Sequence, residues 1–334
     1  MNPPNPSILQ RQSLATLLPA VLLSLLPAMA LADPLPSWNA GHSKSTIVDF
    51  VESTSDPDSE DFVPQERRIA VFDNDGTLWS EQPAYTQLLY ALDRASEADP
   101  EALDTPLKKA AAEGDIDTLL EAGEEGIQAL LSLSHQDLSL SDFQQDVSDW
   151  LANATHPATG RFYTDMVYQP MLELLGYLRD HGFSTYIVSG GGLEFMRVFA
   201  SDVYGVPPQN IIGSTGEMEL VDLEDDPQLY KRGGDIWLDD GPGKVISINR
   251  HLGQRPILAV GNSDGDVPML IWTTEGEGPR LGVLVHHTDG EREVAYDSDS
   301  HIGRLADGLE QAEARDWQLI DMARDWQRLY PEKP

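Results

Sequence analysis

The chain has 334 residues, no cysteine and a formal net charge of −34 at neutral pH. The absence of cysteine excludes disulfides, thiolate metal sites and cysteine nucleophiles. The charge disfavours nucleic acid and anionic membranes as partners, because an acidic surface repels polyanions. The length suffices for one domain with a substantial insertion, and the composition is that of a globular protein.

The amino terminus has the pattern of a secretory signal peptide over residues 1–32. Arg11 is the only charged side chain there, and it precedes a run of Leu and Ala that ends in Ala-Leu-Ala at Ala32. Cleaved signal peptides have this order of charge, apolar centre and small residues. A retained membrane anchor over 14–32 is the alternative, which two prolines within it disfavour. We therefore expect a periplasmic or secreted protein without stable membrane association, with an N-terminal extension over 33–66.

The next informative stretch is an apolar run over 69–72, predicted as a buried strand, which ends at Asp73, Asp75 and Gly76. Side chains at positions i and i+2 of an extended segment point to the same side, so the two carboxylates converge. One could attack an electrophile while the other moves protons. A calcium loop would need Gly in sixth place, whereas Gly76 is fourth. An ordinary turn remains the alternative.

The segment from 78 to 187 is far longer than one crossover helix requires. Its acidic stretches predict an inserted helical unit over 81–163, with the catalytic core over 67–80 and 164–334. The helices expected in this insert are 85–95, 100–112, 116–131 and 141–152. A further helix over 166–179 is expected to lead back to the sheet.

Two later strands also end in polar turns. Residues 184–192 run from β-branched and aromatic side chains into Ser189 and three glycines, whose backbone N–H groups can approach an anion. Residues 256–260 run into 261–266, which read Gly-Asn-Ser-Asp-Gly-Asp. The carboxyl ends of parallel strands meet at one edge of a sheet, so these turns and the acidic loop could assemble one site of oxygen ligands suited to Mg²⁺.

Between these strands lies a smaller excursion. Residues 218–221 and 236–238 are predicted to pair as a hairpin, with Lys231 on its surface. Lys244 then opens an amphipathic stretch that is typical of a helix. After the last polar turn, residues 281–285 are predicted as another buried strand.

Four of these segments resemble, in order, the motifs of the haloacid dehalogenase superfamily. The segments are Asp73-Asn74-Asp75-Gly76-Thr77, Val188-Ser189-Gly190, Lys244, and Gly261-Asn262-Ser263-Asp264-Gly265-Asp266. Each motif is short, but the set in this order is specific. The resemblance covers Arg68 to about Thr274 and implies an α/β fold: a Rossmann-like parallel sheet with helices on both faces, with the insert as a helical cap. The closest subgroup looks similar to phosphoserine phosphatase.

The Asp-x-Asp-Gly-Thr form resembles the phosphatase branch, because dehalogenases of the superfamily lack the second acid and do not use the metal. The resemblance implies that Asp73 attacks phosphorus to form an aspartyl-phosphate. Asp75 would protonate the leaving group and later activate water, while Ser189, Gly190 and Lys244 would hold the phosphoryl oxygens. Such groups suffice together with Mg²⁺, because phosphoryl transfer depends mainly on positioning and charge stabilisation.

The resemblance also implies Mg²⁺ as cofactor, bound by the Asp73 carboxylate, the Asp75 backbone carbonyl and one side chain of the last motif. Here the chain departs from the commonest pattern, which has Asp where this chain has Asn262. An amide oxygen can bind Mg²⁺ but carries no charge. Either the metal affinity is lower, or Asp266 takes a direct role.

Trp79 and Glu81 follow the first motif and are candidates to face a substrate, with ordinary packing as the alternative for each. The expected partner is a small phosphorylated molecule. We therefore expect a Mg²⁺-dependent phosphomonoester hydrolase. Two alternatives use the same fold: a phosphotransferase that passes the phosphoryl group to an alcohol, and a non-catalytic protein that binds Mg²⁺ and phosphate.

Overall fold

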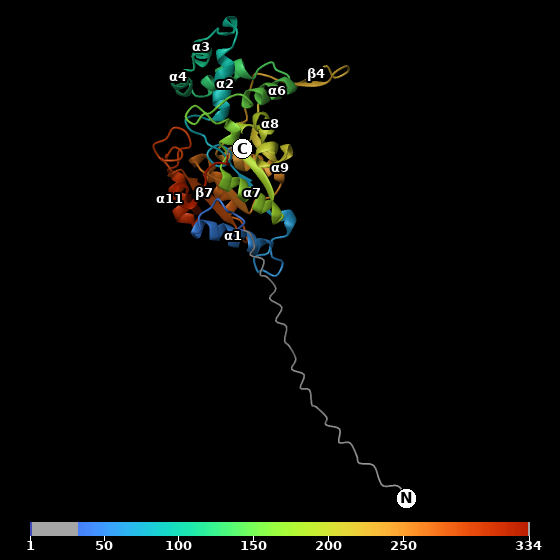
Figure 1. Ribbon diagram of the computed structural model, residues 1–334. Coiled ribbons are helices and arrows are strands. Elements are labelled where there is room, and N and C mark those ends of the chain that lie inside the picture. The colour runs from blue at the N-terminus through green and yellow to red at the C-terminus, as the bar shows by residue number, and fades with distance from the viewer. Residues whose placement is uncertain (2–32, 333–334) are drawn as a thin grey trace. The chain divides into compact units, whose positions relative to one another are not determined.

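The computed structural model describes Met1 and residues 33–332, of which the residues from Pro34 onward form one compact unit (Figure 1). The predicted signal peptide, residues 1–32, lies outside the described residues apart from Met1. None of the described helices combines the length and the apolar character needed to cross a bilayer.

Six parallel strands form the central sheet in the order β3-β2-β1-β6-β7-β8, which confirms the predicted α/β class. Phe72 on β1 is in register with Ile187 on β2 and Val260 on β6, so these strands reach the same edge of the sheet. The strands are β1 (Ile69–Phe72), β2 (Ser184–Gly192), β3 (Ile211–Ser214), β6 (Leu258–Gly261), β7 (Leu281–His286) and β8 (Gln318–Asp321).

Two apolar cores cover the opposite faces of this sheet. Ala70 and Phe72 of β1 belong to a core shared with α1, α7 and α8, whereas Ile69 and Val71 belong to one shared with α9, α10 and α11. Alternate residues of a strand point to opposite faces, so both faces of β1 are apolar and both carry helices, as in doubly wound folds. The helices of the core are α1 (His42–Ser55), α7 (Gln169–Asp180), α8 (Leu193–Tyr204), α9 (Pro242–Leu252), α10 (Val267–Thr274), α11 (Asp307–Arg315) and α12 (Met322–Asp325).

The insert after β1 is helical, and two of its predicted helices are broken. Thr105 caps a new helix at Pro106, because its side chain accepts from the N–H of Lys108 and proline favours a first turn. Gly123, with φ of 59°, interrupts the predicted helix over 116–131. The observed helices are α2 (Thr86–Ser96), α3 (Pro106–Glu113), α4 (Ile116–Glu121), α5 (Glu124–Ser134) and α6 (Leu140–Leu151).

A two-stranded hairpin leaves the core after β3 and stands beside α6 (Figure 1). The predicted pairing of 218–221 with 236–238 is wrong, because β4 (Met218–Val221) pairs with β5 (Gln228–Lys231). The hairpin is tied to the helical insert by two backbone hydrogen bonds of 2.9 Å, from the N–H of Asp137 to Lys231 and from the N–H of Lys231 to Leu138. The hairpin and the helical insert are therefore connected to each other by hydrogen bonds.

Candidate active site

The first segment of the site is a tight loop that follows β1 and begins at Asp73. The carbonyl oxygen of Asn74 accepts hydrogen bonds from the N–H groups of residues 77–79, which turns the chain back on itself. Gly76 has φ of 75°, and a Cβ atom there would lie 2.1 Å from Nδ2 of Asn262. Glycine is therefore needed both for the backbone conformation and for the close approach of the last motif.

Lys244 links the first and last motifs from the opening turn of α9. Its Nζ lies 2.5 Å from Oδ1 of Asp73, 2.6 Å from Oδ1 of Asp266 and 3.0 Å from the carbonyl oxygen of Val188 at the end of β2. The side chain is only 2% exposed. Its three protons thus have three acceptors, one from each of the strand ends predicted to meet.

Burial sets the charge states of these groups. Burial and the neighbouring Asp266 raise the pKa of Asp73 well above its ordinary value, against the opposing effect of Lys244. Burial also raises the pKa of Asp75, although Nε1 of Trp79 donates to its Oδ1 at 2.8 Å. Burial alone would lower the pKa of Lys244, but the adjacent carboxylates hold it above its ordinary value. Asp75 therefore suits proton transfer, and Lys244 remains a cation.

The second segment is the glycine turn at the end of β2. Oγ of Ser189 accepts from the N–H of Gly191 at 3.1 Å, and the pairing of β2 with β3 shifts register between Ser189 and Gly192. The turn passes directly into α8. Its hydroxyl and backbone N–H groups are the kind of donors that bind an anion at a helix start.

The third segment is the loop after β6, which Asp266 folds. Oδ2 of Asp266 accepts from the N–H groups of Asn262 and Ser263 at 3.0 and 3.1 Å. The amide of Asn262 is held at both ends: Oδ1 accepts from Oγ1 of Thr77 at 2.9 Å, and Nδ2 donates to Oε1 of Glu81 at 2.7 Å. The last motif is thereby connected to the loop after β1.

Glu81 lies in a buried polar group behind this loop. Its Oε1 also accepts from the hydroxyl of Tyr296 at 2.6 Å, and burial raises the pKa of Glu81 to about 7. The Tyr296 ring stacks on His287 with centroids 4.3 Å apart, and Nε2 of His287 lies 2.8 Å from the carbonyl oxygen of Gly76. These side chains support the loop after β1 from its far side.

A cavity of about 1330 Å³ extends from the strand ends into the helical insert. Leu88, Leu130 and Leu131 form an apolar part of its wall, and Lys231 of the hairpin contributes a cation. The predicted site residues that line it are Asp73, Asp75, Glu81, Ser189, Gly190 and Lys244. The cavity thus extends from Asp73 to surfaces of the helical insert and of the hairpin.

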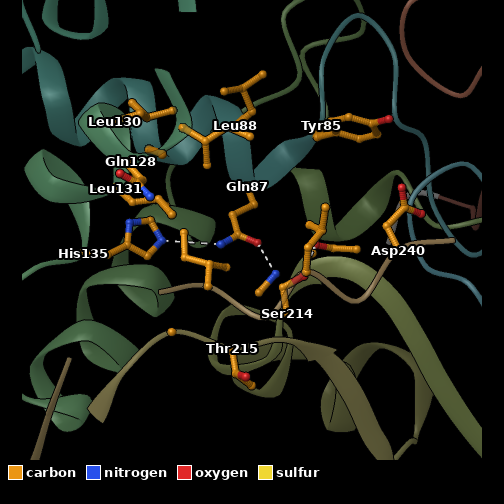
Figure 2. A pocket seen from close by; sticks show the side chains of 18 of the residues that line it. Tyr85, Gln87, Leu88, Gln128, Leu130, Leu131, His135, Ser214, Thr215 and Asp240 are labelled. Atoms are coloured by element: carbon orange, nitrogen blue, oxygen red, sulfur yellow. Dashed lines mark hydrogen bonds between the residues drawn. The ribbon is translucent and has the colours of Figure 1, made fainter. Parts of the chain in front are cut away.

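Gln87 on α2 joins the insert to the glycine turn, as Figure 2 shows. Its Oε1 accepts from the N–H of Gly192 at 2.6 Å, and its Nε2 lies 3.4 Å from Nε2 of His135. Burial lowers the pKa of His135 to about 3, so the ring is neutral and can accept at this nitrogen. The insert is therefore hydrogen-bonded to the glycine turn at the end of β2.

Comparison with known proteins agrees with this geometry. A model of the haloacid dehalogenase-like hydrolase family matches residues 70–270, more than half of the chain. The chain belongs to this family. No curated protein matches it.

Two solved structures share the fold with this haloacid dehalogenase-like hydrolase. A conserved functionally unknown protein from Anaerococcus prevotii DSM 20548 is 16% identical, with a TM-score of 0.55 over 87% of this chain and 94% of its own. A protein with unknown function from Bordetella pertussis Tohama I is 20% identical, with a TM-score of 0.50 over 77% of this chain and 99% of its own.

The donor atoms at the site suit the Mg²⁺ that the family resemblance implies, because they are carboxylate, amide and carbonyl oxygens. Both oxygens of Asp266 are engaged, one by Lys244 and the other by backbone N–H groups. Among the residues that the structure describes, Oδ1 of Asn262 accepts from Thr77 alone, which leaves one lone pair open. Across residues 33–332 no three His, Cys, Asp or Glu side chains form a group that could hold a metal ion by themselves. Asn262 is better placed than Asp266 as the final ligand.

Trp79, predicted as a candidate to face a substrate, is not among the residues that line the cavity. It is 1% exposed, stacks on Phe199 with centroids 4.6 Å apart and donates to Asp75.

Gln87 and Tyr296 were not predicted from the sequence. Tyr296 lies 215 residues from Glu81 in an irregular segment, and no periodicity or motif marks such a contact.

Proposed function

We propose that this hydrolase removes phosphate from phosphomonoesters, with Mg²⁺ as cofactor. The observation that carries the proposal is the contact of 2.5 Å between Lys244 and Asp73 in a cavity that Asp75 and Ser189 also line. A carboxylate attacks an anionic ester only where cations offset their repulsion, and Lys244 supplies one such charge beside the attacking atom.

In this proposal a phosphoryl group binds with its oxygens toward the positive charge of Lys244, Oγ of Ser189 and the N–H of Gly190. A carboxylate oxygen of Asp73 attacks phosphorus, the bond from phosphorus to the ester oxygen breaks, and Asp75 gives its proton to the departing alkoxide. Asp75 then takes a proton from water, which attacks the aspartyl-phosphate and releases inorganic phosphate. Asp73 is regenerated.

The residues that would hold Mg²⁺ are Asp73, Asp75 through its backbone carbonyl, and Asn262. When bound, the ion supplies charge neutralisation for the phosphoryl oxygens. Trp79 supports the reaction indirectly, because its hydrogen bond of 2.8 Å orients the Asp75 carboxyl for proton transfer. The orientation of that acid is a property of this chain's own residues.

The leaving group would lie in the part of the cavity that faces the insert. Its volume of about 1330 Å³ is larger than one phosphate requires and accommodates a small phosphorylated metabolite with its leaving group. The apolar wall of Leu88, Leu130 and Leu131 favours leaving groups with apolar parts. Substrate preference therefore depends on the insert.

A panel of phosphomonoesters with polar and apolar leaving groups tests the proposal. Purified protein without residues 1–32 should release phosphate from several esters with Mg²⁺, and EDTA should abolish the release. Asp73→Asn keeps the shape of the side chain but is a poor nucleophile, so it should be inactive with every ester. Release of phosphate that survives this substitution would refute the assignment of the nucleophile.

We also propose that the protein is exported, on the basis of the signal-peptide pattern over residues 1–32. Expression of the full chain in a Gram-negative host should yield a protein that begins at Asp33 in the periplasmic fraction. Recovery of the uncleaved chain from the cytosol would contradict export.

A further inference from the structure

The buried carboxylate of Glu81 has no ion-pair partner within 4.0 Å among residues 33–332. It is 2% exposed, and its partners are two neutral donors, Asn262 and Tyr296. The nearby His287 makes no hydrogen bond to Glu81, since its ring nitrogens face Glu293 and Gly76, although its charge opposes the rise in the pKa of Glu81. A buried carboxylate without a direct ion pair is costly, and a bound cation would compensate it further.

The two oxygens of Glu81 have different surroundings. Oε1 receives both hydrogen bonds, at 2.7 Å from Asn262 and 2.6 Å from Tyr296. The residue also lines the cavity together with Asp73 and Asp75. One end of the carboxylate is therefore fixed in the loop, and its charge lies next to the site of the expected cation.

The hydrogen bond between Asn262 and Glu81 fixes the orientation of the Asn262 amide. Oε1 of Glu81 accepts both of its hydrogen bonds, so it requires the amide nitrogen of Asn262 on its own side. Oδ1 is then turned toward Thr77 and the loop after β1, where the bond of 2.9 Å holds it. A carboxylate that accepts from a ligand's N–H group fixes that ligand and increases the basicity of its donor atom.

We propose that Glu81 is the positioning residue of the divalent-cation site: it fixes the amide oxygen of Asn262 as a ligand and supplies the negative charge that this amide lacks. The inference rests on the proposed function, because it concerns the cation of the same site. The negative charge beside the cation would then come from Glu81, which lies 181 positions before Asn262 in the sequence. It also replaces the interpretation of Glu81 as a substrate contact.

Binding of Mn²⁺, followed by electron paramagnetic resonance and calorimetry at a constant pH above the Glu81 pKa of about 7, tests this role without turnover. Glu81→Gln keeps the shape and can still accept from Asn262 and Tyr296, but it removes the charge. We expect Mn²⁺ affinity to fall about 10–100-fold. Glu113→Gln on the exposed face of α3 removes an equal charge elsewhere and should leave the affinity unchanged.

A second variant separates this role from general damage to the fold. In Glu81→Gln with Asn262→Asp, the charge moves to the ligand itself, and Mn²⁺ affinity should return to within about threefold of the wild-type value. In EDTA, Glu81→Gln should melt no lower than wild type, because it removes a buried charge that has no direct ion pair. A residue with a merely structural role would show a lower melting temperature and no rescue.

The outcomes are separable from the fate of the proposed function. One outcome overturns the role of Glu81 and leaves the phosphatase proposal intact. In that outcome wild type binds Mn²⁺ and hydrolyses esters, Asp73→Asn does neither, and Glu81→Gln binds Mn²⁺ within twofold of the wild-type affinity. A Glu81→Gln variant with a changed KM for particular esters but normal Mn²⁺ affinity would restore the substrate-contact interpretation. Failure of wild type to bind Mn²⁺ or hydrolyse any ester would overturn both.

Discussion

Replacing Lys244 by Met tests how much the central ion network contributes to stability. Met keeps an apolar stem of similar length but removes the ammonium group, which has contacts of 2.5 and 2.6 Å to Asp73 and Asp266. Both carboxylates are buried, at 6% and 0% exposed, so water cannot replace the lost charge. The variant therefore leaves two neighbouring acids without a cation.

The magnitude follows from the burial of the network. Removing one partner of a buried ion pair costs about 3–5 kcal/mol, because the remaining charge stays desolvated. With an unfolding entropy of about 2.1 cal/mol/K per residue, the chain without residues 1–32 (334 − 32 = 302 residues) should lose roughly 5–8 °C in melting temperature. The loss should appear by calorimetry at neutral pH in EDTA.

The deficit of Lys244→Met should depend on pH with a definite sign. The pKa of Asp73 is already raised in the folded state, mainly by burial, and loss of Lys244 raises it further. A raised folded pKa gives stability that is present below the unfolded pKa, near 3.8, and lost as pH rises through the folded value. The variant should thus approach wild type near pH 4 and fall below it progressively toward neutral pH.

Lys109→Met is the matched control, because Lys109 is exposed on α3 and should change the melting temperature by less than about 1 °C. A Lys244→Met protein that melts within about 1 °C of wild type at neutral pH would refute the reasoning. So would a deficit that grows as the pH falls toward 4.

Three further outcomes follow from the site. Trp79→Phe removes the donor to Asp75 but keeps an aromatic ring, so kcat of the folded protein should fall about 10-fold or more, beside a loss of melting temperature from the smaller buried ring; an unchanged kcat would exclude the orienting role. Gly76→Ala should unfold the chain or cost several kcal/mol, whereas Gly114→Ala, also at positive φ but with nothing within 4 Å, should cost about 1 kcal/mol; equal losses in denaturant titrations would contradict the steric argument. Mg²⁺ at 100 times its Kd should stabilise wild type by about 2.7 kcal/mol and Asp73→Asn by much less, and a thermal scan in which both respond equally would place the ion elsewhere.

The parts of the site that follow strands could be predicted from the sequence. The apolar run before Asp73 and the β-branched run before Ser189 mark strand ends, and parallel strands bring such ends to one edge. Lys244 could be placed only by its order among the motifs, since a lysine at a helix start has no distinctive pattern. The structure gives it three acceptors from three segments.

The contacts that depend on irregular segments could not be predicted. Tyr296 reaches Glu81 from a loop without periodicity, so neither helix nor strand spacing indicates the pair. The sequence predicts 236–238 as the hairpin partner of 218–221, yet the segment Gln228–Lys231 pairs instead. Backbone hydrogen bonds between Lys231 and the insert stabilise this strand pairing, and they connect elements that are far apart in the sequence.

Covalent capture of the phosphoryl group tests the central claim most directly. The Asp75→Asn variant, which should form the intermediate but hydrolyse it slowly, is mixed with a reactive phosphomonoester and Mg²⁺, quenched in acid and analysed by peptide mass spectrometry. The account predicts one added phosphoryl group on the peptide that contains Asp73, and none when Asp73→Asn is added to the variant. Turnover by wild type with the phosphoryl group on Ser189, or on no residue at all, would contradict it.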